Sequence, residues 1–258
     1  MTTKRWLLVT ILLVSQLALA APPTILGHSQ SNNTSNTSSA TLSYTPTCST
    51  LSQCAIVINL ATDGVPTTIS CTDGASHPFT AGTTSTNGSA RIEQFYLYPE
   101  PSGIGSSYSC SWTSSKPSNI ALLELSGLAT SGGINIPTGN TGSGTSSSSQ
   151  SVSPTSSIAN DLMIGAFYAV TNSTTFTIAS SSCVPNAGNC AIATQLAEVT
   201  ASGGSLAVAT NQSSASAQSM AIATTTGASV TWSSVAIEAV PPASIAAPSQ
   251  FTLLGVGN

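Results

Sequence analysis

Short blocks of mostly apolar residues alternate with polar turns along most of the chain. β-branched residues are frequent in the blocks, and glycine or proline interrupts most windows of helical length, which disfavours helices. Each block has the length of a strand, and turn pairs such as Asp63-Gly64 and Asp73-Gly74 follow some of them. The pattern predicts an all-β protein, an immunoglobulin-like or jelly-roll-like antiparallel β-sandwich, with strands at 55–60, 67–71, 90–98, 108–113, 120–125, 161–170, 174–179, 191–199, 205–209, 219–224 and 230–240.

The first twenty residues have the three parts of a secretory signal. Lys4 and Arg5 precede an apolar stretch, and Ala18-Leu19-Ala20 provides a small-x-small cleavage site. The stretch is short for a bilayer span of about 20 apolar residues, so an uncleaved anchor is the weaker alternative. We therefore expect a signal peptide at 1–20, no membrane span in the mature chain, and a secreted or cell-surface location.

The rest of the chain divides by composition. Residues 21–40 are rich in Ser, Asn and Thr, which predicts a polar linker or an extended arm that pairs with a sheet edge of this or another copy. Residues 41–242 are expected to form a single β-sandwich domain. A Gly/Ser/Thr-rich stretch at 131–150 is either a split within it or one long loop, although loops of that length are uncommon in compact domains. Residues 243–258 form a C-terminal tail.

Charge excludes two classes of partner. The chain has 4 Lys and Arg residues and 8 Asp and Glu residues. Removal of the leader leaves Arg91 and Lys116 against the eight carboxylates, a formal balance of −6. Two cations cannot neutralise the phosphates of a nucleic acid or hold an anionic membrane surface. Charged residues are only 5% of the sequence, so hydroxyl and amide groups must keep the protein soluble, as suits an extracellular protein exposed to varied salt.

Six cysteines, an even number, predict a disulfide framework in an exported chain: Cys48, Cys54, Cys71, Cys110, Cys183 and Cys190. Cys48 and Cys54 would close a short loop, and so would Cys183 and Cys190. Cys71 and Cys110 each lie in a strand-like block, which suits a bridge between neighbouring strands. Spacing only ranks the possible pairings and does not fix them.

Metal and cofactor signals are weak. No Cys-x-x-Cys occurs, and His28 and His77 are remote from the cysteines in sequence. Asp63-Gly64, Asp73-Gly74 and Asn160-Asp161 place oxygen ligands in turns, which structural calcium could use, but such pairs are ordinary turn formers. There is no phosphate loop or dinucleotide glycine pattern. We expect no cofactor and no metal.

Aromatic residues in the block 91–98 are candidate ligand contacts. Strand alternation places Tyr96 and Tyr98 on one face and Phe95 on the other. Aromatic rings beside amides and hydroxyls are typical of sugar-binding faces, although packing in the core or at its rim is the commoner role.

Four glutamates give an alternative, catalytic interpretation. Glu93, Glu124, Glu198 and Glu238 all lie in strand-like blocks, where a jelly-roll glycosidase would place its two carboxylates. The run from Glu93 to Tyr96 is similar to carboxylate-bearing strands of small β-jelly-roll xylanases, but no second motif of that family accompanies it. Charges at strand edges also discourage aggregation. No Gly-x-Ser-x-Gly motif supports a serine hydrolase.

Five runs, 67–79, 93–98, 108–112, 121–127 and 160–166, together resemble a recurring secreted bacterial β-sandwich module of surface, adhesin-like and phage-tail-associated proteins. The resemblance implies a sandwich with an attachment or scaffolding role and no catalytic residue. We therefore predict a non-catalytic secreted or cell-surface protein with a binding, adhesive or scaffolding role. Its partner would be a glycan, an exterior protein or other copies of itself; the alternative is a polysaccharide hydrolase.

Overall fold

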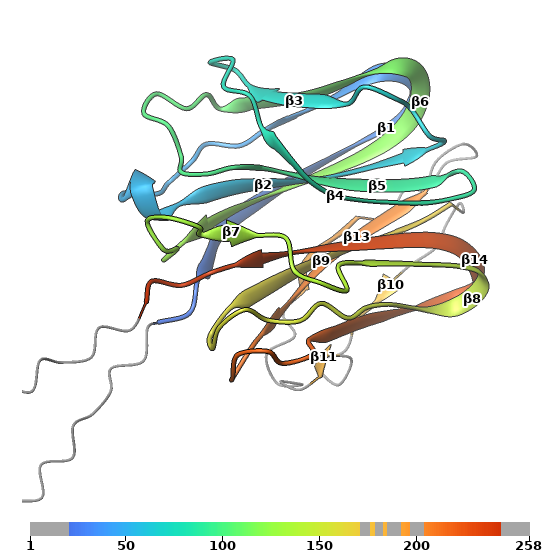
Figure 1. Ribbon diagram of the computed structural model, residues 1–258. Coiled ribbons are helices and arrows are strands. Elements are labelled where there is room, and N and C mark those ends of the chain that lie inside the picture. The colour runs from blue at the N-terminus through green and yellow to red at the C-terminus, as the bar shows by residue number, and fades with distance from the viewer. Residues whose placement is uncertain (1–20, 171–175, 179–182, 185–191, 197–203, 244–258) are drawn as a thin grey trace, which may run out of the picture.

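A computed structural model describes residues 21–170, 176–178, 183–184, 192–196 and 204–243. These residues form fourteen strands and one short 3-10 helix, η1 (Leu51–Gln53), and none of them is in an α-helix. All strand pairings are antiparallel. The structure thus confirms the all-β prediction, and the strands form the two sheets of a disulfide-stabilised sandwich (Figure 1).

The two sheets follow each other along the chain. The first has the strand order β1 (Thr24–Ser43), β6 (Ser107–Ser126), β2 (Ala55–Asp63), β5 (Ala90–Leu97), β4 (Thr80–Asn87), with β3 (Ser70–Asp73) paired to the start of β6. The second has the order β8 (Thr141–Val152), β14 (Ala221–Ala239), β9 (Leu162–Ala169), β13 (Ser205–Gln212), β12 (Ile192–Leu196). Three short strands also pair with β14, namely β7 (Ile134–Asn135), β10 (Phe176–Thr177) and β11 (Cys183–Val184).

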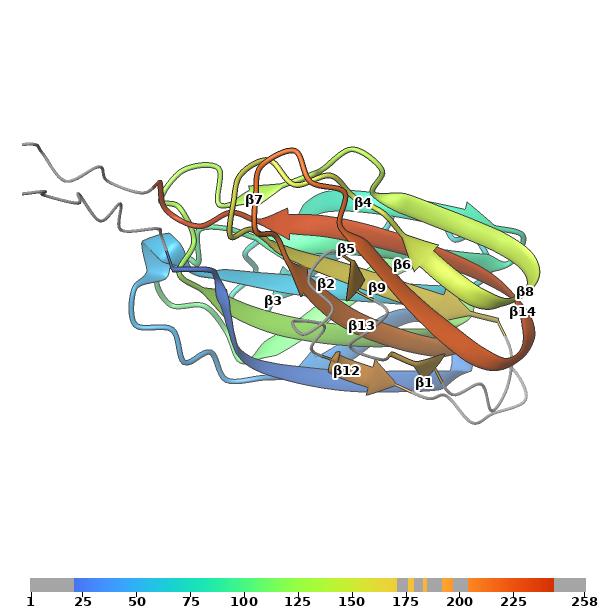
Figure 2. The same ribbon diagram turned by 90° about the horizontal axis from the view of Figure 1, so that it is seen from below.

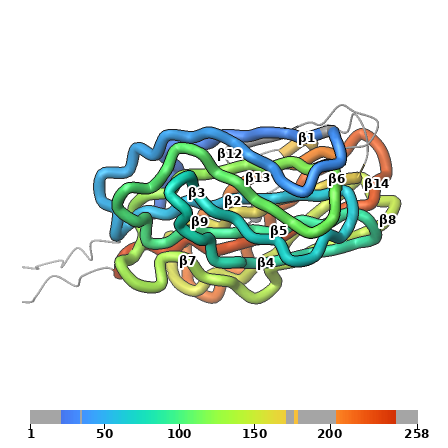
Figure 3. Tube along the Cα trace, turned by 90° about the horizontal axis from the view of Figure 1, so that it is seen from above, coloured from blue at the N-terminus to red at the C-terminus, as the bar shows by residue number. Residues whose placement is uncertain are grey.

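The second sheet repeats the topology of the first. When β8, β9, β12, β13 and β14 are matched in chain order to β1, β2, β4, β5 and β6, the two strand orders are the same. The short strands also correspond, because β3 pairs with β6 and both β10 and β11 pair with β14. The sandwich therefore consists of two structurally equivalent halves. The edge strand β4 of the first sheet packs against β8 and β14, and β12 packs against β1 and β6 (Figure 3).

The longest strands bend and cover the outer face of their own sheet. One half of β6 pairs with β2 and the other half with β3, while β1 follows both halves through register shifts between Asn33 and Ser39. In the second sheet, β14 has its register shifts against β8 between Thr225 and Trp232. Bulges of this kind bend a strand. Figure 1 shows β3 and the bent ends of β1 and β6 folded above β2 and β5.

Three apolar cores result from this arrangement. The inner core lies between the sheets and takes residues from both, for example Val57, Leu123, Ile164 and Ile237. Each sheet also has an outer core of its own under its bent strands. A strand that is buried on both faces has a continuous run of apolar residues in its sequence, instead of alternating apolar and polar residues. This explains the mostly apolar sequence of β2, whose first eight residues are all buried.

Two of the predicted disulfides are confirmed, Cys48–Cys54 and Cys71–Cys110. Cys71 and Cys110 are directly opposite each other in the pairing of β3 with β6, so this bond fastens β3 over the outer core. Disulfides fit a protein that folds outside the reducing cytoplasm. The third candidate pair includes Cys190, which lies outside the described residues.

The Ser/Asn/Thr-rich segment 21–40 and the Gly/Ser/Thr-rich stretch 131–150 both contain strands. The polar segment 21–40 lies mostly in β1, paired with β6 of its own sheet. The stretch 131–150 is not a long loop, because β7 and most of β8 lie within it. β1 begins and β14 ends at the same end of the molecule (Figure 2). The expected signal peptide and nearly all of the tail fall outside the described residues, and none of the described helical segments is long and apolar enough to cross a membrane.

Candidate functional site

A polar cluster lies at one end of the first sheet, where three connections meet: the β1–β2 loop (44–54), the β3–β4 turn (74–79) and the β5–β6 loop (98–106). Three buried carboxyl groups belong to it, Asp73, Glu100 and Glu124. Tyr108, also buried, is near all three. Burial first, and then the charges of these groups, raise the pKa of its hydroxyl.

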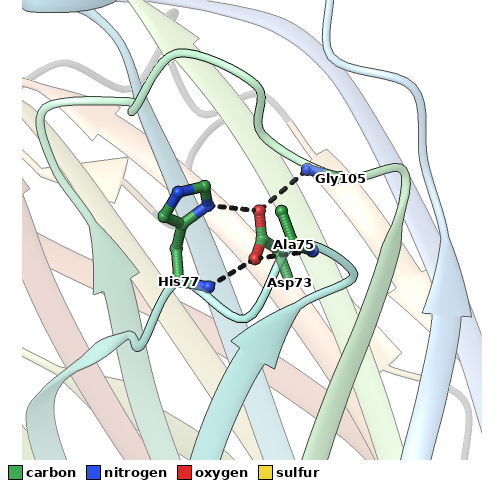
Figure 4. Close-up of polar contacts among 4 residues, drawn as sticks. All are labelled: Asp73, Ala75, His77 and Gly105. Carbon is green, nitrogen blue, oxygen red and sulfur yellow. Dashed lines mark hydrogen bonds and ion pairs between the residues drawn. The ribbon is translucent and has the colours of Figure 1, made fainter.

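Asp73 joins the β3–β4 turn to the β5–β6 loop (Figure 4). Its Oδ1 accepts hydrogen bonds from the backbone N–H groups of Ala75 (3.1 Å) and His77 (2.7 Å), and its Oδ2 accepts one from Gly105 N–H (2.8 Å). Burial alone would raise the pKa of Asp73, but the hydrogen bonds from the His77 side chain and the backbone lower it below its ordinary value. Asp73 is therefore a charged anchor for two loops.

The same carboxylate orients the imidazole ring of His77. Nδ1 of His77 lies 2.9 Å from Oδ2 of Asp73, and one third of the side chain is exposed. Because the carboxylate accepts, Nδ1 carries the proton and Nε2 is left as the free nitrogen of the neutral ring. A catalytic dyad has this orientation. Within the described part of the chain, however, no serine, threonine or cysteine side chain is hydrogen-bonded to the ring, so the pair serves to fasten the turn.

We expect Asp73→Asn to lower the free energy of unfolding by about 1–2 kcal/mol at pH 7, because the amide keeps an acceptor but loses the charge that strengthens these hydrogen bonds. Urea denaturation measures this change. An unchanged free energy of unfolding would contradict the role of Asp73 as the anchor of the two loops.

Glu124 binds the β1–β2 loop. Its Oε1 accepts from the backbone N–H groups of Thr47 (2.7 Å) and Cys48 (2.8 Å). Its Oε2 accepts from the hydroxyls of Tyr44 (2.7 Å) and Thr47 (2.9 Å). The side chain is fully buried, and charge-assisted bonds of this kind are the strong ones. Glu124 thus holds the loop against the end of β6.

Glu100 lies under the same loop without a hydrogen-bonding partner for its carboxyl group. Its backbone N–H donates to the carbonyls of Leu51 (3.2 Å) and Cys54 (3.1 Å). Its side chain is 3% exposed, and neither carboxyl oxygen has a partner among the residues the structure describes. Burial first, and then the charge of Glu124, raise the pKa of Glu100 to about 7. Glu100 is therefore protonated in mildly acidic solution.

The second half has a similar acid pair. Glu238 is opposite Met163 of β9, as Glu124 is opposite Ile56 of β2, and it accepts from Ser157 N–H (2.5 Å) and the Asn135 amide (2.6 Å). Asp161 lies beside it, fully buried. Burial, followed by the hydrogen bond to Glu238, raises the pKa of Asp161 to about 8. The two carboxyl groups thus form a buried acid pair, in which Asp161 Oδ2 also accepts a hydrogen bond from Ile158 N–H (2.9 Å).

The glutamates predicted as catalytic do not form a pair in the described structure. Glu93 pairs with Arg91 at 2.6 Å. Glu124 and Glu238 follow inward-facing neighbours, so both point outward, from opposite sheets. The inner core lies between them, and they cannot flank one cleft. Glu198 lies outside the described residues.

The predicted aromatic contacts are mainly packing residues. Phe95 is wrong as a surface ligand contact, because its side chain is 1% exposed and lies in the outer core of the first sheet. Tyr96 and Tyr98 are partly buried against the inner core, and the Tyr98 hydroxyl donates to the Ala129 carbonyl. Each of the two tyrosines leaves only part of its side chain exposed.

Two turn pairs considered for calcium have other roles. Asp73 and Asp161 accept hydrogen bonds from backbone N–H groups of the turns that follow or precede them. No group of three or more His, Cys, Asp or Glu side chains suited to a metal ion occurs among the described residues.

Glu100, Asp73 and Asp161 were not predicted from the sequence as members of buried polar clusters. Glu100 is flanked by Pro99 and Pro101 and reads as part of a turn, and Asp73 reads as half of an Asp-Gly pair. The signal in the sequence was a carboxylate at or near the end of a strand: Asp73 ends β3, Asp161 directly precedes β9, and Glu100 lies three residues after β5. Known proteins add no assignment to these residues, because no family model matches the sequence and neither a curated protein nor a solved structure is significantly similar to it.

Proposed function

We propose that this protein is a non-catalytic module that acts outside the cytoplasm, where it binds or scaffolds at a cell surface or in the extracellular medium. The observation that carries the proposal is that its glutamate carboxylates bind other groups of the protein itself. Within the described residues, Glu93, Glu124 and Glu238 are all bound by other groups of the protein. A catalytic carboxylate must reach a substrate, and Glu124 and Glu238 are fully buried.

The surface supports a binding role for a neutral partner. Charged residues are 5% of the chain, and two disulfides stabilise the fold. Exposed Ser and Thr side chains alternate along β4 and β8, which pack side by side. Hydroxyl groups recognise glycans or other neutral polar surfaces by hydrogen bonds, without the salt dependence of charged contacts. The resemblance to surface and adhesin-like modules points to the same kind of role.

One observation favours hydrolysis as a second candidate. Glu100, whose raised pKa of about 7 leaves it partly protonated at neutrality, lies near Glu124, which accepts hydrogen bonds from the β1–β2 loop. Glycosidases combine a proton-donating acid with an ionised partner in this way. Against it, both side chains are closed off from solvent, at 3% and 0% exposure.

A co-sedimentation assay with insoluble polysaccharides separates the two functions, when released reducing ends are scored in the same tubes. The proposal expects retention on at least one polysaccharide and no released sugar. Released sugar that disappears in Glu100→Gln would replace the binding module with the hydrolase. Retention that persists in Glu100→Gln, still without released sugar, would leave binding as the function.

A further inference from the structure

A pocket of about 270 Å³ lies beside the disulfide-closed loop, at the end of the molecule where β1 begins and β6 ends. Its volume is slightly below the roughly 300–1,000 Å³ that is usual for sites of drug-sized ligands, and so suits a smaller ligand. The loop provides most of its wall, and Leu26, Ser126 and Gly127 complete it. No charged side chain lines it.

The lining offers free hydrogen-bonding groups beside a small apolar surface. The side chains of Ser49, Thr50 and Gln53 have no hydrogen-bonding partner within the described structure. Leu26 is 43% exposed, which makes it one of the few large apolar side chains on the surface. A sugar ring presents the matching pattern, with hydroxyls around its rim and C–H groups on its face. An ion would find no opposite charge here.

Hydrogen bonds and a disulfide hold the loop that forms the wall of the pocket in place. Glu124 binds the backbone of Thr47 and Cys48, and the Cys48–Cys54 disulfide closes the loop. The Gln53 carbonyl accepts from Leu128 N–H at 3.0 Å. A site fixed before the ligand arrives loses less conformational entropy on binding. The buried Glu124 therefore stabilises the pocket without facing it.

We propose that this pocket, bounded by Leu26, the Cys48–Cys54 loop and Ser126, binds a single neutral sugar unit of a glycan. The proposal rests on the binding function proposed above and assigns it to a place and a ligand class. Gln53 and the hydroxyls of Ser49 and Thr50 would bind the sugar hydroxyls, and Leu26 would contact a face of the ring.

The test measures the dissociation constants of purified protein for microcrystalline cellulose, chitin, insoluble xylan and insoluble β-1,3-glucan, with polygalacturonate as a charged comparison. We expect one of the neutral polysaccharides to bind, and Gln53→Ala and Leu26→Ala each to weaken that binding about three- to tenfold. Two matched controls should leave it unchanged. Gln30→Ala removes an exposed amide from β1, and Val65→Ala removes an apolar side chain that is 45% exposed elsewhere.

Three outcomes would overturn the inference. Binding that survives both Gln53→Ala and Leu26→Ala would move the site elsewhere and leave the proposed function standing. Binding of polygalacturonate alone, or of no polysaccharide, would exclude a neutral sugar as the ligand. Release of reducing ends would instead contradict the proposed function itself. Urea denaturation of each variant should match the unmodified protein, so that a loss of binding reports the pocket and not the fold.

Discussion

The protein should be more stable at pH 4.5 than at pH 8, by several kcal/mol in its free energy of unfolding. The reason is the two buried acids, Glu100 and Asp161. Burial and a neighbouring carboxylate raise their pKa values from 4.5 to about 7 and from 3.8 to about 8. Most soluble proteins, whose carboxylates are paired and charged, show the opposite trend in this range.

The direction of this pH dependence follows from proton binding. Between the ordinary and the raised pKa, the folded protein holds a proton that the unfolded chain has released. The free energy of unfolding therefore falls as the pH rises from about 4 to 7 for Glu100 and to 8 for Asp161, and it levels off above. One pH unit of raised pKa corresponds to about 1.4 kcal/mol, so Glu100 alone accounts for on the order of 3 kcal/mol. Asp161 adds a loss in the same direction.

At low pH, protonation of Asp73 is expected to lower the free energy of unfolding again. Its pKa is lowered by its hydrogen bonds with His77 and Gly105, although burial opposes them. A lowered pKa contributes stability that is present above the ordinary value of 3.8 and is lost as the pH falls toward the folded value. Stability should therefore be greatest at about pH 4–5, between the titration of Asp73 and that of the two raised acids.

Urea denaturation at pH 4.5, 6 and 8 measures the effect, and two isosteric variants assign it. Glu100→Gln and Asp161→Asn imitate the protonated acids, so each should remove its own part of the loss at pH 8. Asp63→Asn is the control for the carboxylate-to-amide change itself, because the Asp63 side chain makes no hydrogen bond within the described structure. A free energy of unfolding that rises steadily from pH 4.5 to 8 would show that the two acids are charged and solvated.

The sequence was sufficient to predict the apolar strands, because local signals specify them. The run 55–60 is apolar throughout because β2 is buried on both faces. The disulfide between Cys71 and Cys110 could be predicted because both cysteines lie in strand-like blocks. β4 and β8 were not predicted as strands, and β1 was predicted only as one alternative, an arm that pairs with a sheet edge. All three are rich in Ser and Thr and leave much of their surface exposed. The strand structure of β1 and β8 comes from pairing with β6 and β14, which are far away in sequence.

The equivalence of the two halves was not readable from residue identities. It lies in the order of pairing, and most matched positions differ, as Ile56 and Met163 do. Glu124 and Glu238 are the matched pair of acids, yet the sequence suggested for them only an edge charge or a catalytic role. The carboxyl of Glu100 is buried because loops 44–54 and 98–106 meet over it, and only the tertiary structure brings them together.

The second large effect is expected from Glu124→Ala, which should lower the free energy of unfolding by about 3–5 kcal/mol at pH 5. The substitution removes the acceptor of two backbone N–H groups and of the hydroxyls of Tyr44 and Thr47. A buried donor left without a partner costs about 1–3 kcal/mol. Water that enters beside the pocket will satisfy some of these donors, which keeps the total below the sum.

A second readout distinguishes Glu124 from an ordinary packing residue. Since the charge of Glu124 helps to raise the pKa of Glu100, Glu124→Ala should shift the pH-dependent loss of stability from Glu100 to lower pH. Glu93→Ala is the control: its carboxylate pairs with Arg91 at a largely buried position, so its loss should also lower stability. Burial and Glu124, and not Glu93, raise the pKa of Glu100, so Glu93→Ala should not move that step. If Glu124→Ala lowered the free energy of unfolding by less than about 0.5 kcal/mol, as neutral surface substitutions do, Glu124 would not hold the β1–β2 loop in place.

The same variant links the buried cluster to the proposed pocket. Glu124 binds the backbone of Thr47 and Cys48, and both residues line the pocket. Under conditions where Glu124→Ala is still folded, the loop should be held only by its disulfide and its remaining backbone bonds, so glycan binding should weaken along with stability. Glu238→Ala removes the matching acid from the other half and should lower stability while leaving glycan binding unchanged. Equal losses of binding in both variants would show that global destabilisation, and not the loop, controls the pocket.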